Sequence, residues 1–431
     1  MRQTDTLSFA QLLSYGLLTM PVAMAGLTLL TFLPTYYAVD LGLGLSVVGI
    51  AFAAGRILDV ITDPILGHWS DQTRTRFGPR KPWMAAGVLG FGAFFWMLVY
   101  PPADVSLVYL VTVGWCFFLC LTMLDVPYSA VGLELSSCVT ERTRLASAKA
   151  AFQVAGALLA GSMPLLFASS IPAALPWIGV LVCAIAVIGF AAFAAFIPVP
   201  QNSQIMPRAS ISESLQALVA HRACRKLIGV FAVVQLGNAF FTALAVLFIT
   251  HVIARPDMVG ALIALMFVST ALFLPAWQYL ARRLGKLSAW KVAIVISCLA
   301  LSLAPFVSKD DLILPVLIFM VIGGTFGGDA ILPTSMLADI THEQEVSGNR
   351  RQAGLFLAVK NASSKLSFVA PLAIAFPVLG WLNFENTANH TGQTLWIFLS
   401  FAAALPILLK FCALALLKGE TKFGLREAAY G

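Results

Sequence analysis

Charged side chains are scarce in this sequence. Asp, Glu, Lys and Arg together make up 11% of its 431 residues, whereas soluble proteins contain about 25% charged residues. Hydrophobic residues make up 59%, so too few polar side chains remain to cover the core of a soluble protein of this length. The same composition excludes a disordered chain and a collagen-like chain. It predicts a membrane protein with several spans.

Cysteine and histidine are also scarce, and neither is arranged for chemistry. Seven cysteines and five histidines are scattered along the chain, with no CxxC pair and no spacing typical of metal ligands. No combination of Ser, His and Asp residues indicates a catalytic site. We therefore expect no enzymatic activity, no cofactor and no disulfide framework.

Twelve apolar runs are long enough to cross a membrane. A helix needs about 20 apolar residues to cross the hydrocarbon core of a bilayer. The sequence therefore predicts an all-α membrane protein with twelve transmembrane helices. We expect these helices at residues 10–38, 46–69, 83–101, 105–133, 147–169, 173–197, 228–252, 258–280, 289–307, 312–338, 353–379 and 393–417.

Basic residues indicate how the chain is oriented. If both termini are cytoplasmic, 21 of the 27 Lys and Arg residues lie at the inner side, and only Arg255 and Lys309 lie in outer loops. Cytoplasmic loops are enriched in Lys and Arg, so we expect a multi-pass protein of the cytoplasmic (inner) membrane with both termini inside. This orientation accounts for the net charge of +7, and no nucleic-acid partner is expected. No cleavable signal peptide is expected either, because only Arg2 precedes a run that is too long for a signal.

The two halves of the chain share landmarks in the same order. A basic turn follows the second run and another follows the eighth, while Asp125 and Asp329 each precede a proline in the fourth and tenth runs. A six-span repeat in parallel is typical of transporters whose substrate site lies at the midplane between two bundles. We therefore predict an N-terminal six-helix bundle at 1–199, a cytoplasmic central loop at 200–226, a C-terminal six-helix bundle at 227–418 and a cytoplasmic tail at 419–431.

Three carboxyl groups lie inside predicted spans. Such groups cost about 2.5–3.5 kcal/mol each near the centre of a bilayer, so they are retained mainly for function. Asp59 and Asp63 are four residues apart and therefore share one helical face. At about 1.5 Å per residue, Asp63 and Asp125 both lie roughly 25 Å from the outer edge of their helices. The three carboxyl groups could therefore converge.

Carboxylates that converge in a low dielectric need a compensating charge. Either a proton is retained or a hard cation such as Na⁺ binds among the oxygens. The hydroxyls of Thr62 and Thr122 could supply further oxygen ligands. In the alternative reading Arg56, three residues before Asp59, neutralises that carboxylate, and the other acids cap helix ends near water. For Asp329 and Asp339 the functional and the structural readings are about equally open.

Basic and aromatic residues inside the spans are candidates for substrate contacts. Lys360 and Lys365 lie in the eleventh run, and Lys365 is too deep to reach the interface easily. Lys365 could contact an anionic or polar group of a substrate, pair with an acid of the N-terminal half, or form a static ion pair between bundles. Lys149, at the start of the fifth run, is similarly open. Tyr128 could stack on a sugar ring or pack between helices.

Several motifs in this chain resemble those of the glycoside–pentoside–hexuronide:cation symporter family, the melibiose-permease-like branch of the major facilitator superfamily. The most specific is RILDVITDP at 56–64, and the others are DVPY at 125–128, ERTRL at 141–145, MLADI at 336–340 and KL at 365–366. The resemblance covers most of the chain and implies two pseudo-symmetric six-helix bundles.

The resemblance also implies roles for individual residues. The cation-binding roles fall on Asp59, Asp63 and Asp125, which would ligate Na⁺ if the protein is sodium-coupled, with Thr122 as a further ligand. Thr62 stands where melibiose permeases have Asn, which leaves Na⁺, Li⁺ and H⁺ open as the coupling cation. Substrate contacts are expected from Asp125, Lys149, Tyr128, Lys365 and Arg56.

The substrate site departs from that of the melibiose carriers. Residues 20–24 in the first run contain no acid, and Ser129 stands where those carriers have Trp. Galactoside specificity is therefore not expected. We predict a monomeric, Na⁺- or H⁺-coupled symporter of a sugar, glycoside or related small polar solute that works by alternating access. The alternative is a proton- or sodium-coupled transporter of an amphipathic substrate such as a lysolipid.

Overall fold

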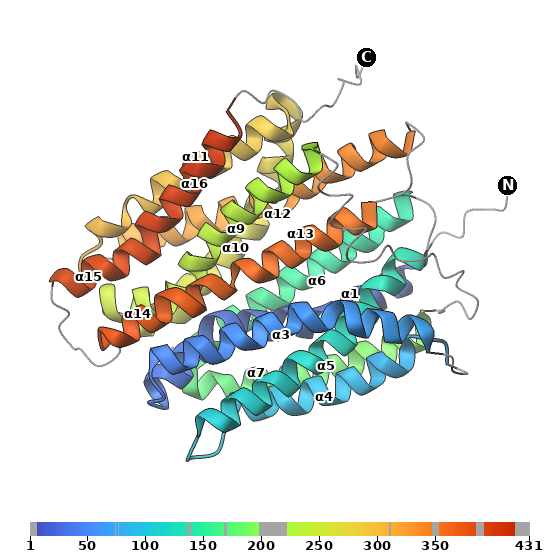
Figure 1. The fold of residues 1–431 in the computed structure, drawn as a ribbon, viewed down its shortest axis with the longest axis horizontal. Coiled ribbons are helices and arrows are strands. Elements are labelled where there is room, and N and C mark those ends of the chain that lie inside the picture. The colour runs from blue at the N-terminus through green and yellow to red at the C-terminus, as the bar shows by residue number, and fades with distance from the viewer. Residues whose placement is uncertain are drawn as a thin grey trace. The chain divides into compact units, whose positions relative to one another are not determined.

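The computed structural model describes residues 7–73, 75, 77–135, 139–167, 170–197, 222–309, 312–346, 353–384 and 392–418. Over these residues the chain is helical and contains no β-strand. Twelve helical stretches are long and apolar enough to span a membrane, which confirms the predicted all-α fold with twelve spans (Figure 1).

The chain divides into two compact units. The first comprises Met1–Met206 and Pro256–Ala264. Its first span runs from α1 (Phe9–Leu27) through α2 (Leu33–Thr35), with π-helical turns at Thr28–Phe32 and Tyr36–Asp40. The Ser8 hydroxyl caps α1 by accepting a hydrogen bond from the amide of Gln11. The other helices of this unit are α3 (Leu45–Gln72), α4 (Lys81–Val99), α5 (Leu107–Glu134), α6 (Val139–Leu166) and α7 (Ile171–Phe196).

The second unit comprises Pro207–Arg255 and Leu265–Gly431. Several of its spans combine α-helix with a short π-helical or 3₁₀ turn. Its elements are α9 (Arg222–Leu247) with a π-helical turn at Phe248–Val252, α10 (Val259–Leu284) preceded by a 3₁₀ turn at Pro256–Met258, α11 (Lys286–Leu301) with a 3₁₀ turn at Ala304–Phe306, α12 (Ile313–Val346), α13 (Ala353–Ser367) with a π-helical turn at Pro371–Ala375, α14 (Phe376–Trp381), α15 (Gly392–Leu399), a π-helical turn at Ser400–Ala404, and α16 (Leu405–Leu416). The first residues of α10 belong to the first unit.

Most helix ends lie within a few residues of the predicted span ends, but three differ clearly. Helix α6 begins at Val139 rather than 147, α12 continues to Val346 rather than 338, and α9 begins at Arg222, within the segment predicted as central loop. Hydropathy marks the edge of the hydrocarbon core, whereas a helix can continue into the aqueous layer with polar side chains. The rest of the predicted loop and the predicted tail at 419–431 lie outside the described residues.

Close helix contacts position α3, α4 and α5 against one another. A Cβ atom at Gly87 of α4 would lie 2.8 Å from the backbone nitrogen of Leu124 in α5. A Cβ atom at Gly55 of α3 would lie 2.6 Å from the ring of Phe118 in α5. Small residues let neighbouring helices approach in this way. As a result α5 is fixed beside the part of α3 that carries Asp59 and Asp63.

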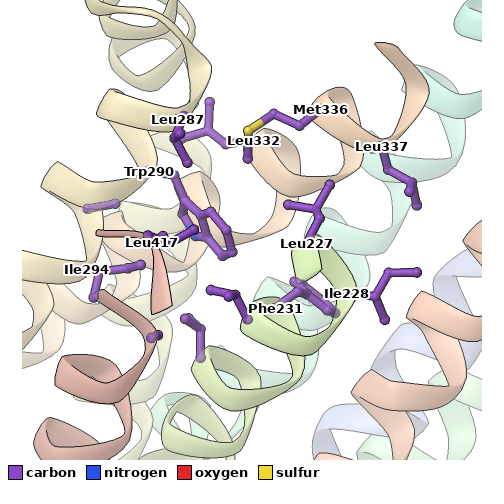
Figure 2. Close-up of a cluster of buried hydrophobic side chains, with 14 of the residues drawn as sticks. Leu227, Ile228, Phe231, Leu287, Trp290, Ile294, Leu332, Met336, Leu337 and Leu417 are labelled. Atoms are coloured by element: carbon purple, nitrogen blue, oxygen red, sulfur yellow. The ribbon is translucent and has the colours of Figure 1, made fainter. Parts of the chain in front are cut away.

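The second unit has an apolar core around Trp290, which is completely buried (Figure 2). The core draws on α9, α11 and α12, together with the end of the last span. The other members labelled in Figure 2 are Leu227, Ile228, Phe231, Leu287, Ile294, Leu332, Met336, Leu337 and Leu417. Packing of this kind fixes the helices that carry the polar groups described below.

Candidate functional site

Asp59 is a fully buried carboxyl group between α3 and α5. Its relative exposure is 0%. The Thr122 hydroxyl donates a hydrogen bond of 3.0 Å to Oδ1, and Nη1 of Arg56 lies 3.5 Å from Oδ2. A buried carboxylate is stable only where hydrogen bonds and an opposite charge replace its hydration. Arg56 and Thr122 supply these to Asp59 in this structure.

Local sequence explains why these groups meet. Arg56 precedes Asp59 by three residues and so lies on nearly the same face of α3. Its guanidinium lies over the ring of Phe118, with Cζ 5.2 Å from the ring centroid. Phe118 also fills the space above Gly55. Thr122 follows Phe118 by one turn of α5. The packing of Phe118 on Arg56 and Gly55 therefore also brings the Thr122 hydroxyl to Asp59.

Thr62 and Asp63 lie next to this pair. The Thr62 hydroxyl lies 3.4 Å from the Thr122 hydroxyl and donates to the carbonyl of Leu58 at 3.0 Å. Asp63 is half-buried and lies within electrostatic range of Arg56. The structure therefore brings Arg56, both threonines and the acid pair of α3 into one polar group.

Asp125 lies in a different environment. It lies three residues after Thr122 on α5. Its half-buried carboxyl is within electrostatic range of Tyr15 and Tyr128. Among the described residues, no three Asp, Glu, His or Cys side chains form a group that could hold a metal ion. The three carboxyl groups therefore do not form one tight cluster in this structure, and the cation-binding roles of Asp59, Asp63, Asp125, Thr122 and Thr62 stay predictions.

Tyr128 and Lys149 form a second polar contact in the first unit. Nζ of Lys149 in α6 lies 3.3 Å from the Ser129 hydroxyl and 4.9 Å from the ring centroid of Tyr128. Tyr128 stacks on Tyr15 at 4.6 Å and donates its hydroxyl to the Tyr15 carbonyl at 2.8 Å. Its exposure is only 2%, so this structure favours packing between helices over stacking on a sugar. Lys149 remains half-buried beside it.

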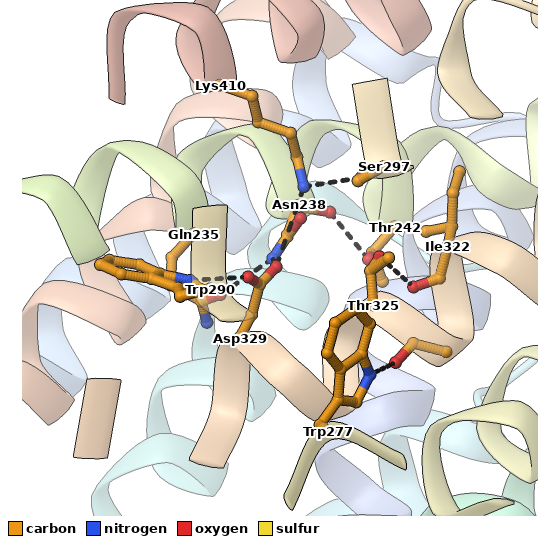
Figure 3. Close-up of polar contacts among 11 residues, drawn as sticks. Gln235, Asn238, Thr242, Trp277, Trp290, Ser297, Ile322, Thr325, Asp329 and Lys410 are labelled. Carbon is orange, nitrogen blue, oxygen red and sulfur yellow. Dashed lines mark hydrogen bonds and ion pairs between the residues drawn. The ribbon is translucent and has the colours of Figure 1, made fainter. Parts of the chain in front are cut away.

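The second unit contains a buried ion pair that the sequence did not indicate (Figure 3). Asp329 of α12 is 2% exposed and Lys410 of α16 is 1% exposed, and Nζ of Lys410 lies 3.8 Å from Oδ2 of Asp329. Oδ1 accepts a hydrogen bond from the indole of Trp290 at 2.9 Å, and Oδ2 accepts one from the amide of Asn238 at 2.9 Å. Lys410 also donates to Ser297 at 2.8 Å. The signal in the sequence that could have indicated this pair was an Asp and a Lys, each within an apolar run of the C-terminal half, because charged residues inside spans usually pair.

This network continues to α13. The Asn238 amide donates to Oε1 of Gln235 at 3.0 Å, and Nε2 of Gln235 donates to the Ser364 hydroxyl at 3.3 Å. One turn earlier, Nζ of Lys360 lies 4.6 Å from the ring centroid of Phe231. These contacts hold α13, which also carries the half-buried Lys365, against α9.

Two ion pairs lie at helix ends. Nη1 of Arg144 donates to both oxygens of Glu141, at 2.9 and 3.0 Å, and the backbone amide of Leu7 donates to Oε2 at 3.0 Å. These contacts, chiefly the hydrogen bond from Arg144, hold the pKa of Glu141 below its ordinary value. In the second unit Lys286 pairs with Asp339, so the structure gives Asp339 a structural partner.

Comparison with known proteins relates most of the chain to transporters. The family described as MFS/sugar transport protein matches residues 14–418. An uncharacterized symporter of Synechocystis is 33% identical over 39% of this chain, and the match spans about a third of that protein, 32%. The putative glycoside/cation symporter YagG of Escherichia coli is 24% identical over 81% of this chain and 77% of its own length. The sodium-dependent lysophosphatidylcholine symporter 1 of Gallus gallus is 25% identical over 78% of this chain and 71% of its own.

A solved structure shows the same fold. A crystal structure of a variant of the nucleoside transporter NupG has a TM-score of 0.70, covering 95% of this chain and 100% of that chain at 14% sequence identity. At this identity the likeness establishes the major facilitator fold alone. Together with the twelve spans and the match over residues 14–418, it shows that the chain is a multi-pass membrane protein that belongs to the MFS/sugar transport protein family, among the melibiose-permease-like symporters.

Proposed function

We propose that this protein is a cation-coupled secondary symporter of a sugar, glycoside or related small polar solute, and that it works by alternating access. The observation that carries the proposal is the buried carboxyl of Asp59, whose partners are Thr122 at 3.0 Å and Arg56 at 3.5 Å. Acids in the interior of a membrane protein typically mark ion and proton pathways. The similarity to a putative glycoside/cation symporter supports the same function.

Coupling follows from the charge of the acid pair on α3. Asp59 and Asp63 lie on one face of α3, and the guanidinium of Arg56 lies beside them. We propose that a bound Na⁺ or H⁺ compensates charge on this acid pair. Thr62 and Thr122 add hydroxyl oxygens, which hard cations prefer as ligands. Neutralising the pair lowers the cost of carrying it through the low dielectric during the conformational change, so the cation and the solute cross together.

The substrate contacts are proposed for the residues around α5 and α6 and for α13. Asp125 accepts hydrogen bonds from hydroxyl groups of a solute, and Lys149 donates to it. Arg56 and Lys365 supply further positive charge, while Tyr128 positions Lys149 through the contact at 4.9 Å. The coupling cation and the solute are both cargo. We place the protein in the cytoplasmic membrane with both termini inside and expect a monomer.

A lysolipid is the second candidate substrate. The observation that favours it is similarity to a sodium-dependent lysophosphatidylcholine symporter over 78% of this chain. The absence of charge at residues 20–24 of the first span agrees with an amphipathic cargo. The two candidates share the proposed cation site and differ only in the solute.

Uptake into proteoliposomes tests the proposal. Radiolabelled probes comprise neutral methyl glycosides, sugar acids, sulfonates and lysophosphatidylcholine, each offered with an inward Na⁺ gradient, an inward H⁺ gradient or none. We expect one cation gradient to drive accumulation of one class, and we expect Asp63→Asn to abolish accumulation while exchange of labelled for unlabelled solute persists. Asp104→Asn, in an exposed loop of the same unit, is the control and keeps full accumulation. Gradient-driven accumulation by Asp63→Asn would show that the coupling role is wrong.

A further inference from the structure

Lys360 lies against the apolar core of the second unit. Its Nζ is 4.6 Å from the ring centroid of Phe231, which is 2% exposed and belongs to the core around Trp290. A lysine that reached for the membrane interface would carry its ammonium away from that core. Lys360 instead rests on an aromatic face and remains half-buried.

No acidic partner compensates Lys360 among the described residues. Its contact in this part of the chain is the aromatic one. Two other lysines of the second unit differ, because Lys410 pairs with Asp329 and Lys286 pairs with Asp339. Asp329 is committed to Lys410, Trp290 and Asn238. The ammonium of Lys360 can therefore interact with a charged group that is not part of the described residues.

Hydrogen-bonding groups lie next to Lys360 where α13 packs on α9. Lys360 and Ser364 are four residues apart on α13, and Phe231 and Gln235 are four apart on α9, so each pair shares a helical face. The half-buried Gln235 and Ser364 bond to each other at 3.3 Å. Gln235 is held in turn by Asn238, whose amide is fixed on Asp329. The ammonium of Lys360, the carboxamide of Gln235 and the hydroxyl of Ser364 thus lie along one seam between α9 and α13.

We propose that this seam, formed by Phe231, Gln235, Lys360 and Ser364, is a subsite for an anionic group of the transported solute, with Lys360 as its counter-charge. The inference rests on the proposed function and narrows the substrate class to solutes that carry a carboxylate, sulfonate or phosphate. A cation held on an aromatic ring with hydrogen-bond donors beside it binds such oxyanions through charge-assisted hydrogen bonds. Both a sugar acid and a phosphate-bearing lysolipid supply this chemistry.

Matched pairs of probes test the subsite and separate the two sources. The first pair is methyl β-D-glucuronide and methyl β-D-glucoside, which differ only in the carboxylate. The second is lysophosphatidylcholine and the monoacylglycerol of the same acyl chain, which lacks the phosphate. KM and maximal rate are measured in proteoliposomes for the wild type, Lys360→Gln and Lys360→Met, which keeps the aliphatic stem on Phe231. Lys360→Arg preserves the charge, and Lys418→Gln, an exposed lysine after α16, is the control.

The expected result is a preference for the anionic member of one pair, which identifies the source. Lys360→Gln and Lys360→Met raise the KM of that probe about tenfold, the loss expected for one charge-assisted contact, while the maximal rate changes little. Lys360→Arg restores the KM to within about threefold, and Lys418→Gln has no effect. Equal effects of Lys360→Met on the anionic and neutral members, or no preference in the wild type, overturn the subsite. Cation-driven uptake of a neutral probe by the wild type would at the same time leave the proposed symport intact, so the two failures are distinguishable.

Discussion

Two buried aspartates show how differently one residue type can be held. Asp329 receives two hydrogen bonds of 2.9 Å and has a fully buried lysine at 3.8 Å. Asp59 accepts a hydrogen bond from Thr122 and has the guanidinium of Arg56 at 3.5 Å. Asp329 is held within the second unit by the indole of Trp290, the amide of Asn238 and the buried Lys410. Asp59 instead lies beside threonine hydroxyls, which hard cations accept as ligands, and this suits a carboxylate that must exchange one compensating charge for another.

At Thr122 we expect a specific loss of cation affinity. Thr122→Ala removes the hydroxyl that donates to Asp59 and would serve as a cation ligand, so several-fold more Na⁺ or H⁺ is needed for half-maximal uptake. Thr122→Ser keeps the hydroxyl and should remain close to the wild type. The measurement is the cation dependence of uptake in proteoliposomes. An equal effect of both substitutions would assign Thr122 to packing rather than to the cation.

At the Asp329–Lys410 pair we expect strong coupling between the two substitutions. Lys410→Met leaves a buried carboxylate without its counter-charge and lowers the free energy of unfolding by about 3–5 kcal/mol. Asp329→Asn in the same chain removes the uncompensated charge, so the double variant recovers most of the loss. Thermal and denaturant unfolding of the purified single and double variants measures this. Simple addition of the two single losses would show that the pair is not energetically coupled.

The spans were predictable from sequence, whereas several helix ends were not. All twelve spans are present because a helix in lipid must be long and apolar, a requirement that hydropathy reports directly. The first turns of α6 and α9 carry charge and lie beyond the apolar core, so hydropathy does not report them. At the start of α6, Glu141 is held by Arg144 and by the backbone amide of Leu7, contacts that hydropathy does not report either.

The candidate site was predictable where its members lie on one helix, and beyond that helix only through depth and family resemblance. Arg56, Asp59 and Asp63 share a helical face by spacing alone, and Thr122 was placed near them by depth and by family resemblance. The Asp329–Lys410 pair joins α12 to α16, and the register between two such helices depends on packing that spacing does not contain. The separate environment of Asp125, within electrostatic range of Tyr15 and Tyr128, has the same origin, because it depends on how α1 packs beside α5.

The contact between α4 and α5 is an element-scale test of close packing. A Cβ atom at Gly87 would lie 2.8 Å from a backbone nitrogen of α5, and a backbone atom cannot move aside. We expect Gly87→Ala to lower the free energy of unfolding by about 1–3 kcal/mol, as overpacked cores do. Gly114→Ala on α5 is the control, because no atom lies within 4 Å of its Cβ position. Similar thermal unfolding of both variants would contradict the proposed close approach.

The contact between Glu141 of α6 and the backbone amide of Leu7 should weaken at low pH. Because the pKa of Glu141 is lowered in the folded protein, its contacts stabilise the fold fully above the ordinary carboxyl pKa of about 4.3. That stabilisation is lost as the pH falls through the lowered pKa. Glu141→Gln should therefore be less stable than the wild type at pH 7, and the difference should shrink toward pH 3. Thermal unfolding across this range checks the sign, and a constant difference would contradict it.

On the scale of the whole molecule, each of the two units has charged groups within its membrane spans. In the first unit Arg56 lies beside the acid pair of α3, and in the second Asp329 pairs with Lys410 while Lys360 lies on the ring of Phe231. In the proposed division of labour, the first unit handles the coupling cation and the second contacts an anionic group of the solute. The family match over residues 14–418 covers both units and so includes the residues of this proposed division.

The central claim is that the solute and the cation cross together. It is tested most directly by adding solute to proteoliposomes that have no cation gradient, with ²²Na⁺ outside or a pH indicator inside. We predict that a transported solute drives Na⁺ or H⁺ into the vesicles, and that Asp59→Asn abolishes this cation entry while solute exchange persists. Solute entry with no movement of either cation would contradict the account.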